Sequence, residues 1–222
     1  MNEAVLTPIL DWLDMAGIAV FALSGALVAA RERQTFVTMG FFALVTGVGG
    51  GTLRDLLIDA PVFWMTDPWV AAICLGTALM VWFTPVRLWD GKLLDYADAV
   101  GLAAYAVLGS AKAIAYGIPP VPAVLMGIIT GCVGGVIRDV VAGRPSIIMQ
   151  PELYVTAAAL SAALTVAGMQ FAQVFGVVSA AIWGAAFVAG FALRAAAIHF
   201  ELGLPSYGGE PAPSPGSSDQ SE

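Results

Sequence analysis

Long apolar runs alternate along the chain with short segments that hold charges, Pro and Gly. A membrane-crossing helix needs about 20 apolar residues, and lipid leaves backbone polar groups no partner outside the segment. The runs lack the two-residue alternation of a membrane β-barrel. The pattern therefore predicts an all-α membrane protein with seven transmembrane helices. The expected helices are Trp12–Ala30, Phe36–Ala60, Trp69–Thr84, Ala97–Tyr116, Val121–Ala142, Leu153–Gly168 and Phe171–Leu193.

Composition supports this class and excludes several functions. Of the 222 residues 59% are hydrophobic and only 11% are charged, whereas a soluble domain is about a quarter charged. The net charge of -7 argues against nucleic-acid binding. One histidine and two cysteines offer little to a metal, and no catalytic triad or phosphate loop is present, so we expect neither an enzyme nor a cofactor. Cys74 and Cys132 lie in separate apolar runs and are expected to be buried free thiols.

Basic residues predict the orientation. They follow alternate helices, which the positive-inside rule assigns to the cytoplasm, so the N-terminus is expected outside and the C-terminus inside. The segment from Met1 to Leu10 lacks the basic start of a cleaved signal peptide, so the first helix is expected to remain as an anchor. The tail from Leu204 to Glu222 is rich in Pro, Gly, Ser and acid and is expected to be disordered. The basic residues used are Arg31, Arg33, Arg87, Lys92, Arg144 and Arg194.

A shift of 84 residues superimposes two parts of the sequence. LDWLDMAGIAVFALSGALVAA lies over LDYADAVGLAAYAVLGSAKAI, and TGVGGGTLRD lies over TGCVGGVIRD. Each copy holds three expected helices, an odd number, so the second copy enters the membrane inverted. We therefore expect a first repeat over residues 1–88, an inverted repeat over 89–169, a seventh helix within 170–200 and a tail over 201–222.

Both copies place a glycine cluster in mid-helix, directly before an Arg-Asp pair. Such a cluster permits a kink that frees backbone oxygens for a polar path, or it serves close helix packing. The charges favour the path, because intramembrane charge is costly and usually functional. The expected pore residues are Thr46, Gly47, Gly49, Gly50 and Gly51 in the first copy, and Thr130, Gly131, Gly134 and Gly135 in the second.

The intramembrane charges are expected to pair across helices. Neighbours on a helix point about 100° apart, so Arg54 and Asp55 are not expected to pair simply with each other. Helix depth instead predicts the pairs Asp14–Arg54 and Asp98–Arg138.

Lys112 breaks the symmetry, because Val28 occupies its counterpart position. It lies at the depth of Asp55, so the two side chains could form a movable gate. The alternative is that Lys112 extends to the membrane surface. Asp139 is the counterpart of Asp55 in the second copy.

The doubled T-G-x-x-G-G-x-x-R-D motif resembles that of the prokaryotic trimeric intracellular cation (TRIC) channels. The resemblance covers about residues 4–197 and implies a homotrimer in the inner membrane of a prokaryote. Each protomer would hold its own pore, lined by two kinked helices and conducting monovalent cations, chiefly K⁺, with Na⁺ and lipid as further partners. Val133 stands where the first copy has Gly49, so a milder kink is expected in the second copy.

Two other functions remain open at this point. The same family has been described as containing glycine transporters, and a glycine carrier could use Arg54 for the carboxylate and Asp14 for the ammonium group. A channel would instead use weak oxygen ligands, such as those of Thr46, Thr130, Ser24 and Ser110. The third possibility is a packed membrane scaffold in which the glycines serve helix contacts only.

Overall fold

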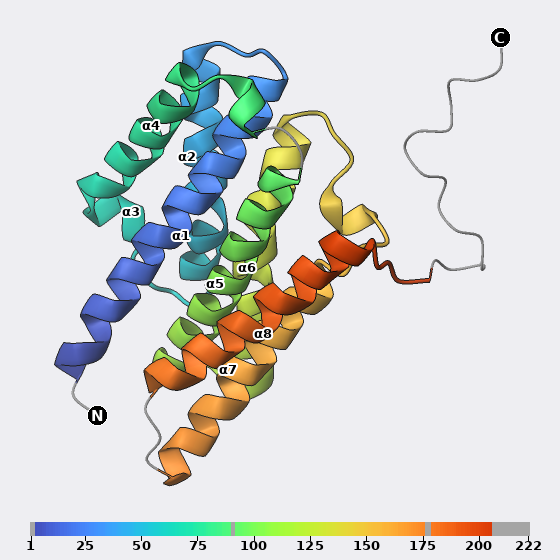
Figure 1. The fold of residues 1–222 in the computed structure, drawn as a ribbon. Coiled ribbons are helices and arrows are strands. Elements are labelled where there is room, and N and C mark those ends of the chain that lie inside the picture. Colours follow the sequence, from blue (N-terminus) through green and yellow to red (C-terminus); the bar gives the residue numbers. More distant parts are fainter. Residues whose placement is uncertain (1–2, 90–91, 176–178, 206–222) are drawn as a thin grey trace.

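The computed structural model describes residues 3–89, 92–175 and 179–205 and is a bundle of helices (Figure 1). Its long helices are α1 (Glu3–Arg31), α2 (Phe36–Leu57), α4 (Pro68–Phe83), α5 (Leu93–Ala115), α6 (Pro120–Val141), α7 (Val155–Phe175) and α8 (Ser179–Phe200). The short helix α3 (Phe63–Thr66) and the 3-10 turns η1 (Val86–Trp89) and η2 (Ile147–Met149) lie in the connections.

The helices pack as two similar groups that meet along their long axes. Helix α1 packs against α2 and α4, and α5 packs against α6 and α7 in the same manner. The groups join through α1 on α5 and through α2 on α6, while α8 covers α5 and α7. In Figure 1, α1 and α5 run in opposite directions, as do α2 and α6. The second group is therefore arranged as an inverted counterpart of the first.

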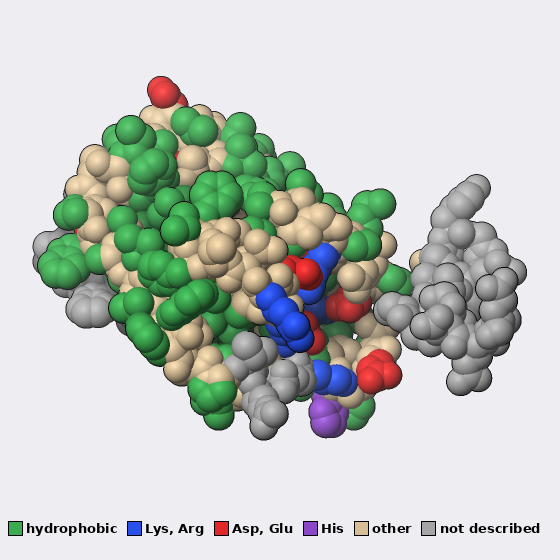
Figure 2. Space-filling model, turned by 90° about the horizontal axis from the view of Figure 1, so that it is seen from above, with side chains coloured by type: hydrophobic (Ala, Val, Ile, Leu, Met, Phe, Trp, Pro, Cys, Tyr) green, Lys and Arg blue, Asp and Glu red, His purple; other side chains and the backbone are tan. Residues whose placement is uncertain are grey.

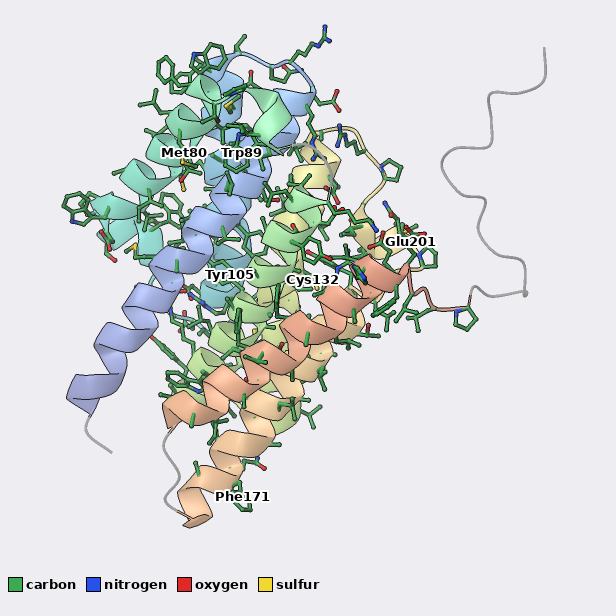
Figure 3. All side chains as sticks on the ribbon, in the orientation of Figure 1. Met80, Trp89, Tyr105, Cys132, Phe171 and Glu201 are labelled. Carbon is green, nitrogen blue, oxygen red and sulfur yellow. The ribbon has the colours of Figure 1, made fainter. Side chains whose placement is uncertain are left out.

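Within the described residues, six helices are long and apolar enough to cross a membrane, and α4 is a shorter apolar helix. Large apolar side chains point outward from several of them, including Val37, Phe83 and Val121. Figure 3 contrasts Tyr105, in the bundle interior, with Phe171, near the end of α7. An outer surface of this kind suits lipid and not water.

The predicted helix boundaries need three corrections. Helix α1 begins at Glu3, well before the expected start at Trp12, and α3 was not expected. The expected break between Gly168 and Phe171 is absent, because α7 continues to Phe175. A Cβ atom at Gly168 would collide with the side chain of Ile182 in α8, so this glycine permits close helix packing instead of ending a helix.

The end of the bundle where α8 terminates carries a mixture of charges. Figure 2 looks onto this end and shows acidic and basic side chains gathered there among hydrophobic ones. Arg194 was expected to follow the last helix, but it lies within α8, is buried, and pairs with Glu152 at 2.5 Å. It is therefore a packing residue as well as a positive charge at this end. Residues 206–222 of the expected tail lie outside the described residues.

Candidate functional site

The centre of the molecule is the crossing of α2 and α6, where the two glycine clusters face each other. A Cβ atom at Gly50 would collide with the carbonyl oxygen of Thr130, and one at Gly134 would lie 2.8 Å from the carbonyl oxygen of Thr46. Both contacts join positions related by the 84-residue repeat. Only glycine permits the two backbones to approach this closely.

The helices are not interrupted at these glycines. Residues 36–57 and 120–141 are helical throughout, so the expected weak point does not break either helix. The remaining glycines of the clusters contact other neighbours: Gly47 faces Cys74 and the carbonyl of Ile18, Gly49 faces Ile137, Gly51 faces Phe63, Gly131 faces the carbonyl of Leu102, and Gly135 faces the hydroxyl of Tyr154. In this conformation close packing accounts for the glycines, and backbone fills the space between α2 and α6.

Two further glycines hold α1 against α2 and α5 against α6. A Cβ atom at Gly25 would lie 2.6 Å from Thr46 Oγ1, and one at Gly109 would lie 2.5 Å from Thr130 Oγ1. Sequence reasoning aligned these two glycines but assigned them no role. Their separation of 84 residues was the available signal, because a contact made in one copy is repeated in the other.

One turn beyond the crossing, on α2, Arg54 lies in a cluster of buried charges. Its side chain is 0% exposed, and its Nε donates to Asp55 Oδ1 at 2.8 Å. Lys112 Nζ donates to the same oxygen at 2.8 Å, and the Phe63 amide donates to Asp55 Oδ2 at 3.0 Å. Arg54 Nη1 lies 3.6 Å from Asp14 Oδ1, and neither Nη1 nor Nη2 has a hydrogen-bond partner among the described residues.

On the other side of the crossing, Arg138 occupies the equivalent place on α6. Its Nε donates to Asp139 Oδ1 at 2.9 Å, and its Nη1 donates to Asp98 Oδ1 at 2.5 Å and to Ser24 Oγ. The Ile147 amide donates to Asp139 Oδ2 at 3.0 Å, which repeats the Phe63–Asp55 contact 84 residues earlier. Arg138 therefore has more close partners than Arg54.

The comparisons with known proteins agree with this duplicated arrangement. A family model described as Glycine transporter matches twice, at residues 11–85 and 95–170. A UPF0126 membrane protein of Vibrio cholerae is 40% identical over 162 residues, which cover 70% of this chain and 66% of that protein. The UPF0126 inner membrane protein YadS of Escherichia coli K12 is 37% identical over 202 residues, covering 88% of this chain and 95% of YadS. The chain belongs to the UPF0126 family.

Comparison with solved structures identifies the fold of this UPF0126 protein. The TRIC trimeric intracellular cation channel orthologue from Rhodobacter sphaeroides is 38% identical, with a TM-score of 0.78 over 87% of this chain and 99% of that one. A prokaryotic TRIC channel solved in 0.5 M KCl is 27% identical, with a TM-score of 0.79 over 89% of this chain and 100% of that one. The protein thus has the prokaryotic TRIC channel fold, and it belongs to a family of membrane proteins and not of enzymes.

The geometry confirms the cross-helix pairs and corrects one expectation about them. Asp14–Arg54 and Asp98–Arg138 are both ion pairs, at 3.6 Å and 2.5 Å. Arg54 and Arg138 also bind the aspartate that follows each of them, which was not expected. The Cβ atoms of neighbouring helix residues do point apart, but the long arginine side chain turns back far enough for Nε to reach the next carboxylate.

The expected contact between Lys112 and Asp55 is present, and the Lys112 side chain is 22% exposed. Lys112 therefore points to a buried carboxylate and does not simply extend to the surface. The contact of Ser24 with Arg138 was not predicted, because the Ser24 hydroxyl was expected only as a possible ion ligand. Its counterpart in the repeat is the apolar Leu108, so this hydroxyl is present on one side only.

The hydroxyl groups proposed as ion ligands differ in their present bonding. Thr130 Oγ1 donates to the Met126 carbonyl at 2.6 Å and Ser110 Oγ to the Ala106 carbonyl at 2.9 Å, both within their own helices. Thr46 Oγ1 is buried without a hydrogen-bond partner among the described residues. Thr46 is therefore the hydroxyl at the crossing that is available to a new ligand.

Tyr154, which precedes α7, lies beside the buried charges around Arg138. This side chain is 0% exposed, and burial raises the pKa of its phenol well above the ordinary value, so the group stays neutral. Its hydroxyl would lie 2.7 Å from a Cβ atom at Gly135. Gly135 therefore leaves room for a tyrosine against α6.

The part of the chain that the structure describes offers little to a metal site or to a disulfide. No group of three or more His, Cys, Asp or Glu side chains there could hold a metal ion. Cys74 and Cys132 are both free and buried, as expected from the sequence. The site is therefore an arrangement of backbone, hydroxyl groups and ion pairs at a helix crossing.

Proposed function

We propose that this protein is a potassium-permeable cation channel whose ions pass between α2 and α6 in each protomer of a homotrimer. The observation that carries the proposal is the pair of buried arginine clusters on opposite sides of the glycine crossing. The antiparallel helices place these arginines about 18 Å apart along the bundle, at 1.5 Å per residue. Charges within a bilayer are costly and concentrate along ion pathways.

The packed crossing corresponds to a closed state in this proposal. Opening would separate the Gly50–Thr130 and Gly134–Thr46 contacts and leave carbonyl oxygens and the Thr46 hydroxyl facing the path. Ligands of this kind bind cations weakly enough for conduction. Lys112, held on Asp55, would then act as the gate, because moving it changes the charge at one mouth of the path.

The membrane arrangement follows from the same proposal. Seven crossings would be made by two inverted three-helix repeats, the first within residues 1–88 and the second from residue 89 to the end of α7, followed by α8. The N-terminus would face outward and the C-terminus the cytoplasm of a prokaryotic cell with the protein in its inner membrane. Similarity to a TRIC trimeric channel supports the homotrimer, and similarity to YadS supports the inner membrane.

The position of the path is tested by removing one hydroxyl. Thr46→Val keeps the side-chain shape and removes an oxygen that has no partner among the described residues. We expect slower K⁺ flux into proteoliposomes with no loss of thermal stability. Thr165→Val is the matched control, because Thr165 is equally buried but bonds the Ser161 carbonyl within α7, away from the crossing. Equal flux through the two variants would contradict a path past Thr46.

A glycine carrier is the second candidate, and the Arg54 cluster favours it specifically. Two guanidinium nitrogens there have no hydrogen-bond partner among the described residues, while Asp14 and Asp55 lie beside them. The carboxylate of glycine could bind the two guanidinium nitrogens of Arg54, and its ammonium group could bind Asp14 and Asp55. Saturable uptake of labelled glycine by the same proteoliposomes, without ionic current, would establish the carrier and overturn the channel.

A further inference from the structure

The connection from α2 to α4 contains α3 and lies against the Arg54 cluster. The Phe63 amide donates to Asp55 Oδ2 at 3.0 Å, and the Phe63 ring lies over the Arg54 guanidinium, with its centroid 5.8 Å from Cζ. A guanidinium within about 6 Å of an aromatic centroid is attracted to the ring. A Cβ atom at Gly51 would lie 2.6 Å from that ring, so this glycine lets the ring rest on α2. Phe63 therefore covers part of a cation that is 0% exposed.

A second aromatic side chain holds α3 to α2. Trp64 Nε1 donates to Thr52 Oγ1 at 2.8 Å, and that hydroxyl donates in turn to the Val48 carbonyl at 2.7 Å. Trp64 is 37% exposed and Met65 is 70% exposed, so one side of α3 is open to its surroundings. An exposed hydrogen bond contributes little to stability, because water can replace either partner. This short helix is therefore held loosely enough to open locally.

The connection after α6 repeats the backbone contact without the aromatic side chains. The Ile147 amide donates to Asp139 Oδ2 at 3.0 Å, as the Phe63 amide does to Asp55. The side chains around this shared contact are apolar and aliphatic, and none of them offers a hydroxyl. The equivalent residues, 84 positions apart, are Ile147 for Phe63, Ile148 for Trp64 and Val136 for Thr52. The aromatic cover is therefore a feature of the first copy.

Asp55 connects α3 to Lys112. Its Oδ2 accepts from the Phe63 amide at 3.0 Å, and its Oδ1 accepts from Lys112 Nζ at 2.8 Å. The two oxygens belong to one planar group, so a rotation that moves one of them also moves the other. In the second copy Val28 occupies the position equivalent to Lys112 and offers Asp139 no cation. The link between a connection and a lysine is therefore present in the first copy only.

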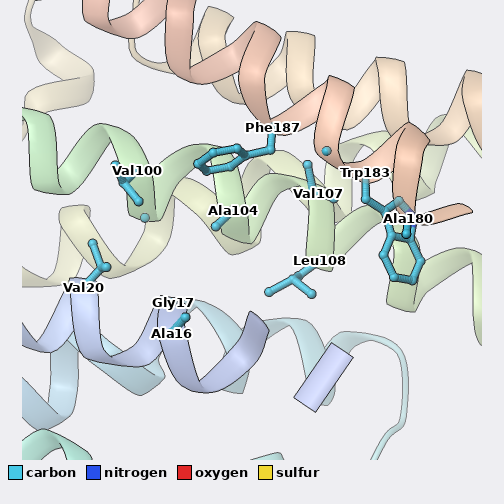
Figure 4. Close-up of a pocket in the computed structure, with 12 residues that line it drawn as sticks. Ala16, Gly17, Val20, Val100, Ala104, Val107, Leu108, Ala180, Trp183 and Phe187 are labelled. Atoms are coloured by element: carbon cyan, nitrogen blue, oxygen red, sulfur yellow. The ribbon is translucent and has the colours of Figure 1, made fainter. Parts of the chain in front are cut away.

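The exposed groove between α1, α5 and α8 offers no alternative entrance to this cluster (Figure 4). The residues that line it include no charged side chain, and its walls are formed by small or apolar ones such as Gly17, Ala104 and Phe187. A charge that leaves water for such a surface loses its hydration without compensation. The connection that covers Arg54 is therefore the candidate entrance.

We propose that α3 is a lid on the outer mouth of the ion path and that Asp55 couples this lid to Lys112. Release of Lys112 from Oδ1 lets the carboxylate turn, which weakens the bond between Oδ2 and the Phe63 amide. The short helix then lifts from Arg54, so lid and gate open together. The ion path rests on the proposed function, whereas the coupling between α3 and Lys112 can be measured without any ion flux.

The coupling is tested by amide hydrogen exchange of the purified full chain, followed by mass spectrometry on peptides from both connections. Exchange around Phe63 reports opening of the lid. Exchange around Ile147 is the internal control, because this connection repeats the amide–aspartate bond without a lysine at the equivalent position. The variant is Lys112→Gln, and its matched control is Lys92→Gln, whose lysine binds the end of α8.

We expect Lys112→Gln to speed exchange around Phe63 about fivefold, as for two neighbouring contacts that are moderately coupled. Exchange around Ile147 should stay unchanged, and Lys92→Gln should match the wild type in both connections. Unchanged exchange around Phe63 in Lys112→Gln would overturn the coupling. Faster exchange in both connections would overturn it as well, because the substitution would then have loosened the whole bundle.

The role of α3 as a lid has a separate test. Trp64→Phe removes the bond to Thr52 and keeps an aromatic ring, and Trp69→Phe is its matched control at an exposed tryptophan of α4. Trp64→Phe should raise the ratio of open to closed time in KCl about fivefold, as for one net hydrogen bond, and Trp69→Phe should not.

The possible failures of the lid and of the channel are distinguishable. Faster exchange around Phe63 in Trp64→Phe, with an unchanged ratio of open to closed time, would show that α3 moves without acting as a lid. Absence of any cation current would overturn the proposed channel and with it the role of the lid, while a coupling measured by exchange would stand.

Discussion

Arg54 and Arg138 occupy equivalent positions in the two repeats, yet their surroundings differ. Arg138 binds Asp98 at 2.5 Å, Asp139 at 2.8 Å and the Ser24 hydroxyl. Arg54 binds Asp55 at 2.8 Å and approaches Asp14 only to 3.6 Å. Duplication thus supplied the same motif twice, and differences in neighbouring positions give Arg138 more close partners than Arg54.

Two substitutions between the copies account for the difference. Where the second cluster has Ser24, the repeat has Leu108, which offers no acceptor. Where the first cluster has Lys112, the repeat has Val28. The first cluster therefore lacks one hydroxyl and has one extra cation, which competes with Arg54 for Asp55. We infer that the Arg138 cluster fixes the fold and that the Arg54 cluster is the one that moves.

The largest effect should come from removing each arginine in turn. Arg138→Leu leaves Asp98 and Asp139 buried without a cation, and we expect it to lower the free energy of unfolding by about 3–5 kcal/mol. Arg54→Leu should cost less, about 1–3 kcal/mol, because Lys112 still binds Asp55. Thermal unfolding in detergent measures both. If Arg54→Leu lowers the free energy of unfolding as much as Arg138→Leu or more, the inference that the Arg138 cluster fixes the fold is wrong.

A smaller effect should follow from removing the hydroxyl that only the second cluster has. Ser24→Ala deprives Arg138 of an acceptor and should cost about 2 kcal/mol, as for a hydrogen bond to a charged group. Ser110→Ala is the matched control, because this buried serine bonds a carbonyl in its own helix and should cost about 1 kcal/mol or less. If the two variants lose the same free energy of unfolding, the Ser24 hydroxyl does not account for the difference between the clusters.

The smallest effect should come from a charge pair outside the bundle core. Arg144 binds Glu32 between the connections of the two repeats, and both side chains are about two-fifths exposed. Solvent screens such a pair, so Arg144→Ala should change the free energy of unfolding by less than about 1 kcal/mol. A loss comparable with that of Arg138→Leu would mean that the buried clusters do not dominate.

Much of this arrangement could be predicted from the sequence, because the bilayer imposes strong rules. Hydropathy located the long helices. Helix depth paired Asp14 with Arg54, and the 84-residue repeat extended that pairing to Asp98 and Arg138. Because the sequence is duplicated, a contact predicted in one copy is also expected at the equivalent positions of the other copy. Helix depth made the contact between Lys112 and Asp55 one of two alternatives, and the structure shows that contact.

The remaining features depend on side-chain reach and packing. Helix geometry excluded a pair between Arg54 and Asp55, but it did not account for the four rotatable bonds of arginine. Gly168 was interpreted as a helix end, although it provides space for Ile182. A glycine in lipid serves a break or a close contact equally well, and only the position of the neighbouring helix distinguishes them.

The most direct test of this account is the single-channel current of the purified protein in asymmetric KCl, recorded for the wild type and for Lys112→Gln. Loss of the Lys112–Asp55 ion pair should raise the ratio of open to closed time about tenfold, as for a charged hydrogen bond that is partly exposed to solvent. The unitary K⁺ conductance should stay unchanged. Lys92→Gln is the control, because Lys92 binds Glu201 and the Ile198 carbonyl away from the crossing. Cation-selective steps with this change in open time are the predicted result. Absence of cation-selective current, or equal open times in all three proteins, would contradict the account.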